Sequence, residues 1–206
     1  MEAQKLQISS GIAKGMRLSA PKSTKTRPTS AVVREAMGNV FQGQLEGRKI
    51  LDLFSGTGAM GIELLSRGAS EATFVENDPQ CAKILRQNVN EFMRRSRQQG
   101  IDLAEPQVIT RDVKKFLTGS LGSYDQKFDI IWVDPPYHET AAWSKILCET
   151  NTAIINSEGV ICIEAEKKTC SEVENIFKES PWEIQKIRTY GRSAVIILNH
   201  QKKDES

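Results

Sequence analysis

The chain has 206 residues, 39% of them hydrophobic, and a formal net charge of +2, which suits one α/β domain with a small appendage and leaves no room for a second catalytic domain. No apolar run approaches the roughly 18 to 20 residues that cross a bilayer, and the amino-terminal segment lacks the apolar centre of a signal peptide, so we expect a cytoplasmic protein without membrane partners. Four cysteines without C-x-x-C spacing, beside two histidines, indicate neither a zinc site nor a disulfide framework, and we expect no metal.

Residues 1–45 predict a small appendage made of a hairpin and a helix. Alternating apolar positions in residues 6–9 and 16–18 indicate two short strands around a glycine-containing turn. After a connector, Thr29 or Ser30 can cap a helix whose apolar positions recur at helical spacing and which a glycine ends. This helix is expected to pack on the main domain.

The appendage has an uneven charge. From Lys5 to Arg34 the sequence has seven basic residues and no acidic one. Such side chains suit a polyanion, because each phosphate contact releases counterions and adds salt-dependent affinity. Charge alone suits a solvated basic arm equally well. The candidate phosphate-binding residues are Lys14, Arg17, Lys22, Lys25, Arg27 and Arg34.

Strands and helices alternate through residues 46–200, which we assign to the main domain. Strands are predicted at residues 50–53, 72–76, 107–110, 128–133 and 160–164, and helices at 59–67, 113–117, 140–155 and 171–178. A further helix is predicted to begin at Pro79, with Asp78 as its cap, and to continue into basic residues 94–97. This alternation gives a parallel sheet with helices on both faces and right-handed crossovers.

The end of the chain departs from this rhythm. Residues 182–187 and 194–198 are predicted strands joined by a short Gly191-Arg192 turn, so the last strand must be antiparallel to its partner. The fold is therefore predicted to be a Rossmann-like, mostly parallel seven-stranded sheet with a terminal antiparallel hairpin, as in class I methyltransferases. A dinucleotide dehydrogenase would continue with a sixth parallel strand. Residues 201–206 are polar and expected to be disordered.

A glycine motif follows the first strand of the main domain. Gly56, Gly58 and Gly61 satisfy the dinucleotide-binding pattern, and Glu76 lies where a ribose-binding acid belongs. Asp52 favours a different ligand, because a carboxylate before the turn repels a pyrophosphate and attracts the ammonium and sulfonium groups of S-adenosylmethionine. The sequence therefore favours a methyl-donor pocket over a nicotinamide site.

Further residues complete the predicted pocket. Glu76 can accept both ribose hydroxyls of either cofactor. Asp112 suits a hydrogen bond to the adenine amino group, with the backbone N–H of Val113 beside it, although Asp112 could instead cap the next helix. The predicted cofactor-binding set is Asp52, Phe54, Gly56, Gly58, Glu76, Asn77, Asp112 and Val113.

A second motif, Asp134-Pro135-Pro136-Tyr137, follows an apolar strand and falls at the same sheet edge. The prolines fix the backbone and can hold the Asp134 carboxylate and the Pro135 carbonyl in one orientation. Two such acceptors would stabilise an exocyclic amine that becomes positive as it attacks a sulfonium methyl group. Tyr137 could stack on the flipped base, so all four residues form the predicted catalytic set.

At these residues the chain resembles the RsmD family, bacterial methyltransferases that modify a guanine N2 in small-subunit (16S) ribosomal RNA. The similarity covers Lys14-Gly15-Met16-Arg17-Leu18, Thr26-Arg27-Pro28-Thr29, Val33-Arg34-Glu35-Ala36, residues 52–63, residues 65–69 and residues 134–137. The resemblance implies that the basic hairpin engages ribosomal RNA, alone or with ribosomal proteins of the subunit. It also implies that residues 27–29 lie near the methyl-donor pocket as a lid.

Several alternatives stay open. The Asp-Pro-Pro-Tyr motif also occurs in adenine-N6 DNA methyltransferases, and the fold could serve a ribosome assembly factor without catalysis. The basic stretch in residues 92–106 departs from the family pattern and could be a second phosphate contact, although we favour a solvated helix end. A monomer is expected.

Overall fold

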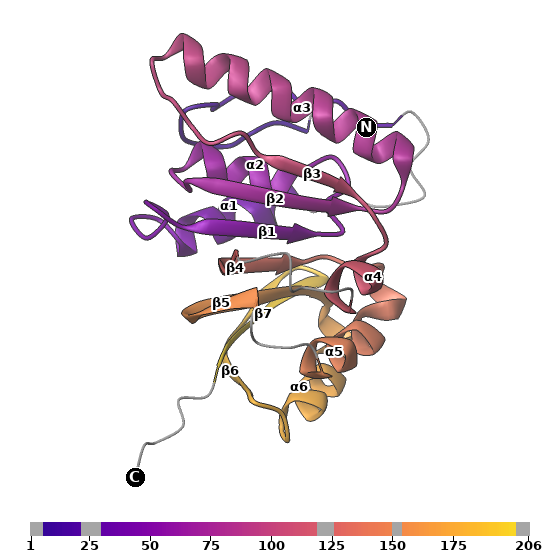
Figure 1. The fold of residues 1–206 in the computed structure, drawn as a ribbon. Coiled ribbons are helices and arrows are strands. Elements are labelled where there is room, and N and C mark those ends of the chain that lie inside the picture. Colours follow the sequence, from indigo (N-terminus) through magenta and orange to yellow (C-terminus); the bar gives the residue numbers. More distant parts are fainter. Residues whose placement is uncertain (1–5, 22–29, 119–125, 150–153, 201–206) are drawn as a thin grey trace.

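The computed structural model describes residues 6–21, 30–118, 126–149 and 154–200. Its centre is a seven-stranded sheet with the order β3-β2-β1-β4-β5-β7-β6 (Figure 1). The strands are β1 (Lys49–Leu53), β2 (Glu71–Glu76), β3 (Gln107–Thr110), β4 (Phe128–Val133), β5 (Ile155–Glu166), β6 (Trp182–Tyr190) and β7 (Ser193–His200). The helices are α1 (Ala31–Val40), α2 (Ala59–Ser66), α3 (Pro79–Gln98), α4 (Val113–Thr118), α5 (Thr140–Glu149) and α6 (Cys170–Phe177), with short 3-10 helices η2 (Tyr137–Glu139) and η4 (Lys167–Thr169).

The strand directions confirm the predicted Rossmann-like sheet. The first five strands pair in parallel, and β7 pairs antiparallel with both β5 and β6. The chain grows outward from β1 to β3 and then returns to β4 beside β1, which makes a switch point between these two strands. In sheets of this kind, ligands bind outside the carboxyl ends of the strands at the switch point.

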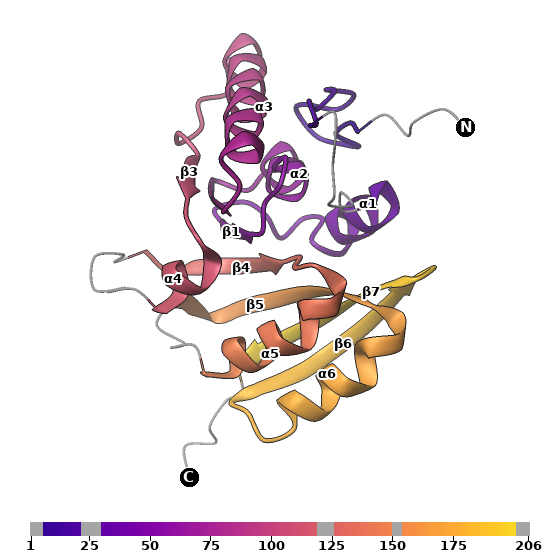
Figure 2. The same ribbon diagram turned by 90° about the vertical axis from the view of Figure 1, so that its right-hand side faces the viewer.

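Helices cover both faces of the sheet (Figure 2). One core layer joins α1, α2 and α3 to the sheet, and the other joins α4, α5 and α6 to its opposite face. The side chains of β4 alternate between the layers, with Ile130 and Trp132 in the first and Ile131 and Val133 in the second. Burial on both faces explains why residues 130–133 form a continuous apolar run.

Local signals in the sequence set the starts of two helices. The Ser30 hydroxyl accepts a hydrogen bond from the Val33 N–H at the start of α1, and the Asp78 carboxylate accepts one from the Cys81 N–H at the start of α3. Such caps satisfy N–H groups that have no partner within the helix. Both capping predictions are therefore confirmed for the described residues, whereas Thr29 lies outside them.

The predicted helix at residues 140–155 is wrong at its end. Helix α5 ends at Glu149, and Ile155 already begins β5, where it pairs with Phe128 of β4. The Asn156 side chain also donates a 2.8 Å hydrogen bond to Asp129 of β4. Pairing with β4 therefore overrides the apolar spacing that suggested a longer helix.

The amino-terminal segment differs from the predicted β-hairpin. Its described residues form a single antiparallel bridge between Gln7 and Arg17, supported by a 2.9 Å hydrogen bond from the Ile8 N–H to the Met16 carbonyl. Ile8 and Met16 nevertheless belong to the core layer that contains α1 and α2. The segment is thus fixed by apolar packing more than by strand pairing.

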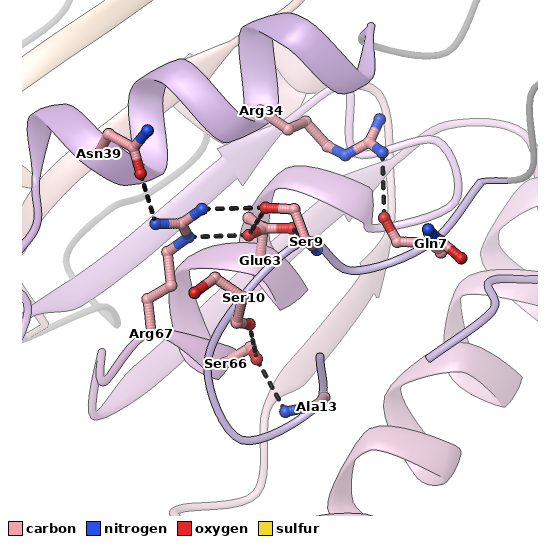
Figure 3. A network of polar contacts seen from close by, with 9 residues as sticks. All are labelled: Gln7, Ser9, Ser10, Ala13, Arg34, Asn39, Glu63, Ser66 and Arg67. Atoms are coloured by element: carbon pink, nitrogen blue, oxygen red, sulfur yellow. Dashed lines mark hydrogen bonds and ion pairs between the residues drawn. The ribbon is translucent and has the colours of Figure 1, made fainter. Parts of the chain in front are cut away.

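A buried polar network also holds this segment on α2 (Figure 3). The fully buried Glu63 carboxylate accepts hydrogen bonds from the Ser9 N–H at 2.8 Å, from the Ser9 hydroxyl at 2.6 Å and from Arg67 at 2.8 Å. Arg67 in turn donates to Asn39 of α1 at 3.0 Å. A buried carboxylate needs such partners, because its transfer out of water is costly.

Candidate active site

The two sequence motifs meet at the switch point. Leu53 and Val133 are partners in the β1–β4 register, and the Asp134 N–H lies 3.5 Å from the Leu53 carbonyl oxygen. The residues that follow β1 and β4 therefore leave the sheet side by side. This places the glycine loop and the Asp-Pro-Pro-Tyr motif at one edge, as predicted from the sequence.

Asp52 is a buried acid at the centre of this edge. Its side chain is 2% exposed, and it accepts a 3.0 Å hydrogen bond from the Gly61 N–H. Burial raises the pKa of Asp52 to about 8; the hydrogen bond from Gly61 opposes this shift, and the carboxylates of Asp134 and Glu76 add to it. The charges of Asp134 and Glu76 thus favour a positive charge beside Asp52, either its own proton or a cationic ligand.

The glycine loop has an open cradle at Gly56. This residue has a φ of +53°, and a Cβ placed on it would meet only the Phe54 carbonyl, at 4.0 Å. Its N–H donates a 2.7 Å hydrogen bond to the Glu76 carboxylate, which also accepts one of 2.8 Å from the Asp78 N–H. Glu76 is therefore fixed at the end of β2, beside the half-buried Gly56.

Gly61 is required for a different reason. A Cβ on this helical residue would lie 2.3 Å from a ring carbon of Phe74 and 3.0 Å from the Asp52 carboxylate. A side chain there would disturb both the packing of α2 on β2 and the position of Asp52. One glycine of the motif thus leaves space for a ligand, and another allows close packing behind it.

The next predicted residues lie at the ends of β2 and β3. Asn77 is exposed, and Val113 is buried at the start of α4. The Asp112 carboxylate accepts a 2.9 Å hydrogen bond from the Lys115 N–H, so it caps α4. The capping alternative is thus confirmed; a single carboxylate has further acceptor capacity, so the proposed adenine contact stays compatible with it.

The four residues of the Asp-Pro-Pro-Tyr loop differ in solvent exposure. Pro135 is buried, Asp134 and Tyr137 are half-buried, and Pro136 is exposed. The Tyr137 hydroxyl contacts Glu164 on β5 and Ser193 at the start of β7. The tyrosine end of the motif is therefore held by β5 and β7, whereas Asp134 at its other end lies beside β1.

An aromatic pair that the sequence did not predict lies beside the glycine loop and the Asp-Pro-Pro-Tyr motif. Phe54 has a φ of +60°, which is uncommon for a residue with a side chain, and such conformations concentrate at functional sites. Its ring meets that of Trp143 on α5 edge to face, with centroids 4.7 Å apart. The Trp143 indole N–H donates a 3.1 Å hydrogen bond to Glu139. Phe54 was in the predicted cofactor set; Trp143 had no signal beyond its place one turn after the motif.

The predicted phosphate-binding residues separate into three groups. Lys14 and Arg17 are exposed on the amino-terminal segment. Lys22, Lys25 and Arg27 lie outside the described residues, as does the predicted lid at residues 27–29.

Arg34 corrects the prediction. It is 2% exposed, on the face of α1 that packs against the sheet, and it donates a 3.3 Å hydrogen bond to the Gln7 carbonyl oxygen (Figure 3). A guanidinium buried in this way cannot reach a phosphate on the surface. Arg34 is therefore an internal structural charge.

The basic end of α3 has its own acidic partners. Arg94 and Arg95 pair with Glu91 at 2.8 and 2.7 Å, and Arg97 pairs with Glu105 at 2.9 Å. Arg94 and Arg97 are exposed and Arg95 is half-buried, and each has an acidic partner within the same helix or the segment after it. The arrangement favours a solvated helix end, the interpretation preferred from the sequence.

Two negative findings concern only part of the chain. Within residues 6–21, 30–118, 126–149 and 154–200, no group of His, Cys, Asp and Glu side chains is arranged to hold a metal ion. No helix in those ranges is both long and apolar enough to cross a membrane. The four cysteines are free thiols.

The parallel sheet with its antiparallel terminal hairpin, the glycine loop and the acids at the switch point define a class I methyltransferase, an enzyme class that takes its methyl group from S-adenosylmethionine. A family model described as Conserved hypothetical protein 95 matches residues 6–199. The chain belongs to this family, the RsmD family.

Individual relatives agree with this assignment. Ribosomal RNA small subunit methyltransferase D of Haemophilus influenzae is 31% identical over 189 residues, which cover 90% of this chain and 89% of that protein. The protein of the same name from Escherichia coli K12 is 27% identical over 203 residues, covering 98% and 93%. The solved structure of a hypothetical protein from Thermus thermophilus is 26% identical, with a TM-score of 0.71, and covers 94% of this chain and 98% of that one.

Proposed function

We propose that this methyltransferase transfers a methyl group from S-adenosylmethionine to the exocyclic N2 amine of a guanine in small-subunit ribosomal RNA. The observation that carries the proposal is the position of Asp134, at the end of β4 beside the end of β1, where its charge acts on Asp52. The relatives named Ribosomal RNA small subunit methyltransferase D support ribosomal RNA as the substrate class.

The cofactor-binding residues each have a physical role. The Asp52 carboxylate would bind the ammonium group of the methyl donor, and Glu76 its ribose hydroxyls. The open backbone at Gly56 allows close approach without a Cβ in the way. Phe54, Gly58, Asn77, Asp112 and Val113 complete this proposed set. S-adenosylmethionine bound there would supply an electrophilic methyl group: the N–C bond to the amine would form in line as the S–C bond breaks, S-adenosylhomocysteine would leave, and the methylated amine would then lose a proton.

The acceptor residues act on the base. A guanine amine is a poor nucleophile, because its lone pair is delocalised into the ring, and it becomes positive as it attacks. The Asp134 carboxylate and the Pro135 carbonyl would accept hydrogen bonds from this amine and stabilise the developing charge. The Tyr137 ring would stack on the base and hold it in line for attack. No covalent bond to the protein is needed.

The appendage at residues 1–45 would bind the RNA. Lys14 and Arg17 are exposed there. Their charges support contacts with phosphates outside the base pocket. We retain Lys22, Lys25 and Arg27 in this proposed set, and we omit Arg34.

A methylation assay with Asp134→Ala tests the proposal. Ribosomal small subunits and free RNA lacking the modification are incubated with labelled methyl donor and then digested to nucleosides. We expect labelled N2-methylguanosine with the unchanged chain, and a loss of at least a hundredfold with Asp134→Ala, while methyl-donor binding measured by calorimetry changes little.

Asp102→Ala serves as the control, since Asp102 is an exposed acid. Its rate should match that of the unchanged chain. Labelled N6-methyldeoxyadenosine from a DNA acceptor would overturn the proposal in favour of a DNA methyltransferase. Binding to small subunits without transfer to any acceptor would favour an assembly factor without catalysis.

A further inference from the structure

The Tyr137 hydroxyl lies between two buried polar groups on different strands. It donates a 3.2 Å hydrogen bond to the Glu164 carboxylate of β5 and lies 2.7 Å from the Ser193 hydroxyl, the first residue of β7. A phenol has one proton, so donation to Glu164 requires that Ser193 donate to the phenol oxygen. Both contacts can then form together, and they fix the ring at its outer end.

Glu164 is an unusual residue for its position. It is 2% exposed near the carboxyl end of β5, and its neighbours Ile163 and Ala165 belong to the opposite core layer. An ionised carboxylate is buried at a considerable cost unless charges and hydrogen bonds compensate for it. A residue of this type in this place suggests a role other than packing.

Arg34 supplies the compensating charge. This guanidinium is also 2% exposed, and Glu164 is one of the two carboxylates whose charge acts on it, the other being Glu63. Arg34 comes from α1, and its hydrogen bond to the Gln7 carbonyl links it to the amino-terminal segment. The phenol of the acceptor loop is thus connected through Glu164 to the helix that follows the proposed RNA-binding segment.

We propose that Glu164 and Ser193 are positioning residues for Tyr137 and act through their contacts with its hydroxyl. The inference rests on the proposed function, in which the Tyr137 ring stacks on the target base. Glu164 and Ser193 do not touch the base. They fix the plane of the ring, so that the base is held in line with the methyl group.

A double-mutant cycle between Tyr137→Phe and Ser193→Ala tests the proposal. Tyr137→Phe keeps the ring and removes only the hydroxyl, and Ser193→Ala removes its partner. We expect each single variant to lower kcat about three- to tenfold, with the KM for S-adenosylmethionine unchanged. Because Ser193 acts through the phenol, Ser193→Ala should have no further effect in the Tyr137→Phe background.

Two further variants separate positioning from a general effect on structure. Glu164→Gln keeps an acceptor oxygen in place, so it should retain more activity than Tyr137→Phe. Ser171→Ala, at an exposed serine of α6, should leave kcat unchanged. Equal losses from Ser193→Ala in both backgrounds, or no loss from either single variant, would overturn the proposal.

The same double-mutant cycle, with the free energy of unfolding in urea measured in the absence of RNA, tests the contact between Tyr137 and Ser193. The destabilisation from Ser193→Ala should be smaller in the Tyr137→Phe background than in the unchanged chain. Additive effects on unfolding would refute the contact even if the acceptor were not a guanine. Failure of the proposed function would instead appear as absence of labelled N2-methylguanosine from the unchanged chain, so the two failures are distinguishable.

Discussion

The side-chain amide of Asn88 donates a 2.9 Å hydrogen bond to the carbonyl oxygen of Thr57, at the centre of the glycine loop. The same amide donates to the Ser19 carbonyl at 3.1 Å, and its oxygen accepts from the Ser19 N–H at 2.8 Å. Asn88 is 3% exposed in the middle of α3. One buried side chain therefore joins the methyl-donor loop to the amino-terminal segment.

Asn88→Ala should weaken both structure and ligand binding. The change leaves three backbone groups without their partner, and we expect the free energy of unfolding to fall by about 1–3 kcal/mol. Methyl-donor affinity, measured by calorimetry, should fall severalfold because the loop loses its support. Asn90→Ala, at an exposed position on the same helix, is the control. Similar effects from the two variants would contradict this role of Asn88.

Methyl-donor binding should depend on pH through Asp52. Burial raises the pKa of Asp52 to about 8, and a cationic ligand binds the ionised form, so binding near pH 7 should release a proton. Affinity should rise up to about tenfold per pH unit below this pKa and level off above it. Calorimetry across pH measures this, and Asp52→Asn should flatten the profile. A pH-independent affinity in the unchanged chain would contradict the ammonium contact.

The same group makes the unliganded protein less stable at high pH. The native pKa of Asp52, about 8, exceeds the ordinary value of 3.8, so between these values the native state holds the extra proton. The stability of the native state is therefore full at low pH and declines as the pH rises through this window. Asp52→Asn should remove this decline, raising Tm relative to the unchanged chain at pH above about 8.

Two Glu–Arg pairs at the same helical spacing should differ strongly in their effects. Glu63 and Arg67 form a buried pair, with side chains 0% and 8% exposed, whereas Glu91 and Arg95 are 35% and 36% exposed. Glu63→Ala should cost about 3–5 kcal/mol and speed proteolysis within residues 6–18, because Arg67 and Ser9 lose their acceptor. Glu91→Ala should cost less than about 1 kcal/mol. Chemical denaturation measures both, and equal costs would refute the structural importance of the buried network.

The amino-terminal cations should set the salt dependence of RNA binding. If Lys14 and Arg17 each contact a phosphate, Lys14→Gln and Arg17→Gln should each reduce the slope of log Kd against log salt by about 0.7 to 0.9. Arg97→Gln is the control, since Arg97 is paired with Glu105. Filter binding over a range of salt concentrations measures the slopes. A larger change from Arg97→Gln would place the RNA surface on α3 instead.

The sequence predicted the main features of the fold because local signals and tertiary packing agree there. The strand that ends at Val133 is apolar apart from Asp129, and Asp78 with Pro79 marks a helix start that the structure retains. Both motifs lie at the sheet edge because topology alone brings the ends of β1 and β4 together. The helix that continued to Ile155 was wrong because pairing with a distant strand decided that segment.

The features that were missed depend on contacts between distant segments. Charge counting placed Arg34 on the surface, because a count of charges ignores which face of the helix carries each residue; Arg34 is buried with Val33 and Met37. Neither Glu164, at the end of an apolar run, nor Ser193 was singled out from the sequence. Its contact with Tyr137 joins residues 56 positions apart, which single-sequence patterns do not reveal.

Strand β7 lies between β5 and β6, although it follows both in the chain. The sheet is therefore complete only when β7 has inserted between β5 and β6, which are both synthesised before it. Because Ser193 is its first residue, a chain interrupted earlier retains the glycine loop and the Asp-Pro-Pro-Tyr motif but has no complete support for the tyrosine. With the role proposed for Tyr137, the order of synthesis leaves the acceptor loop without its full support until β7 has joined the sheet.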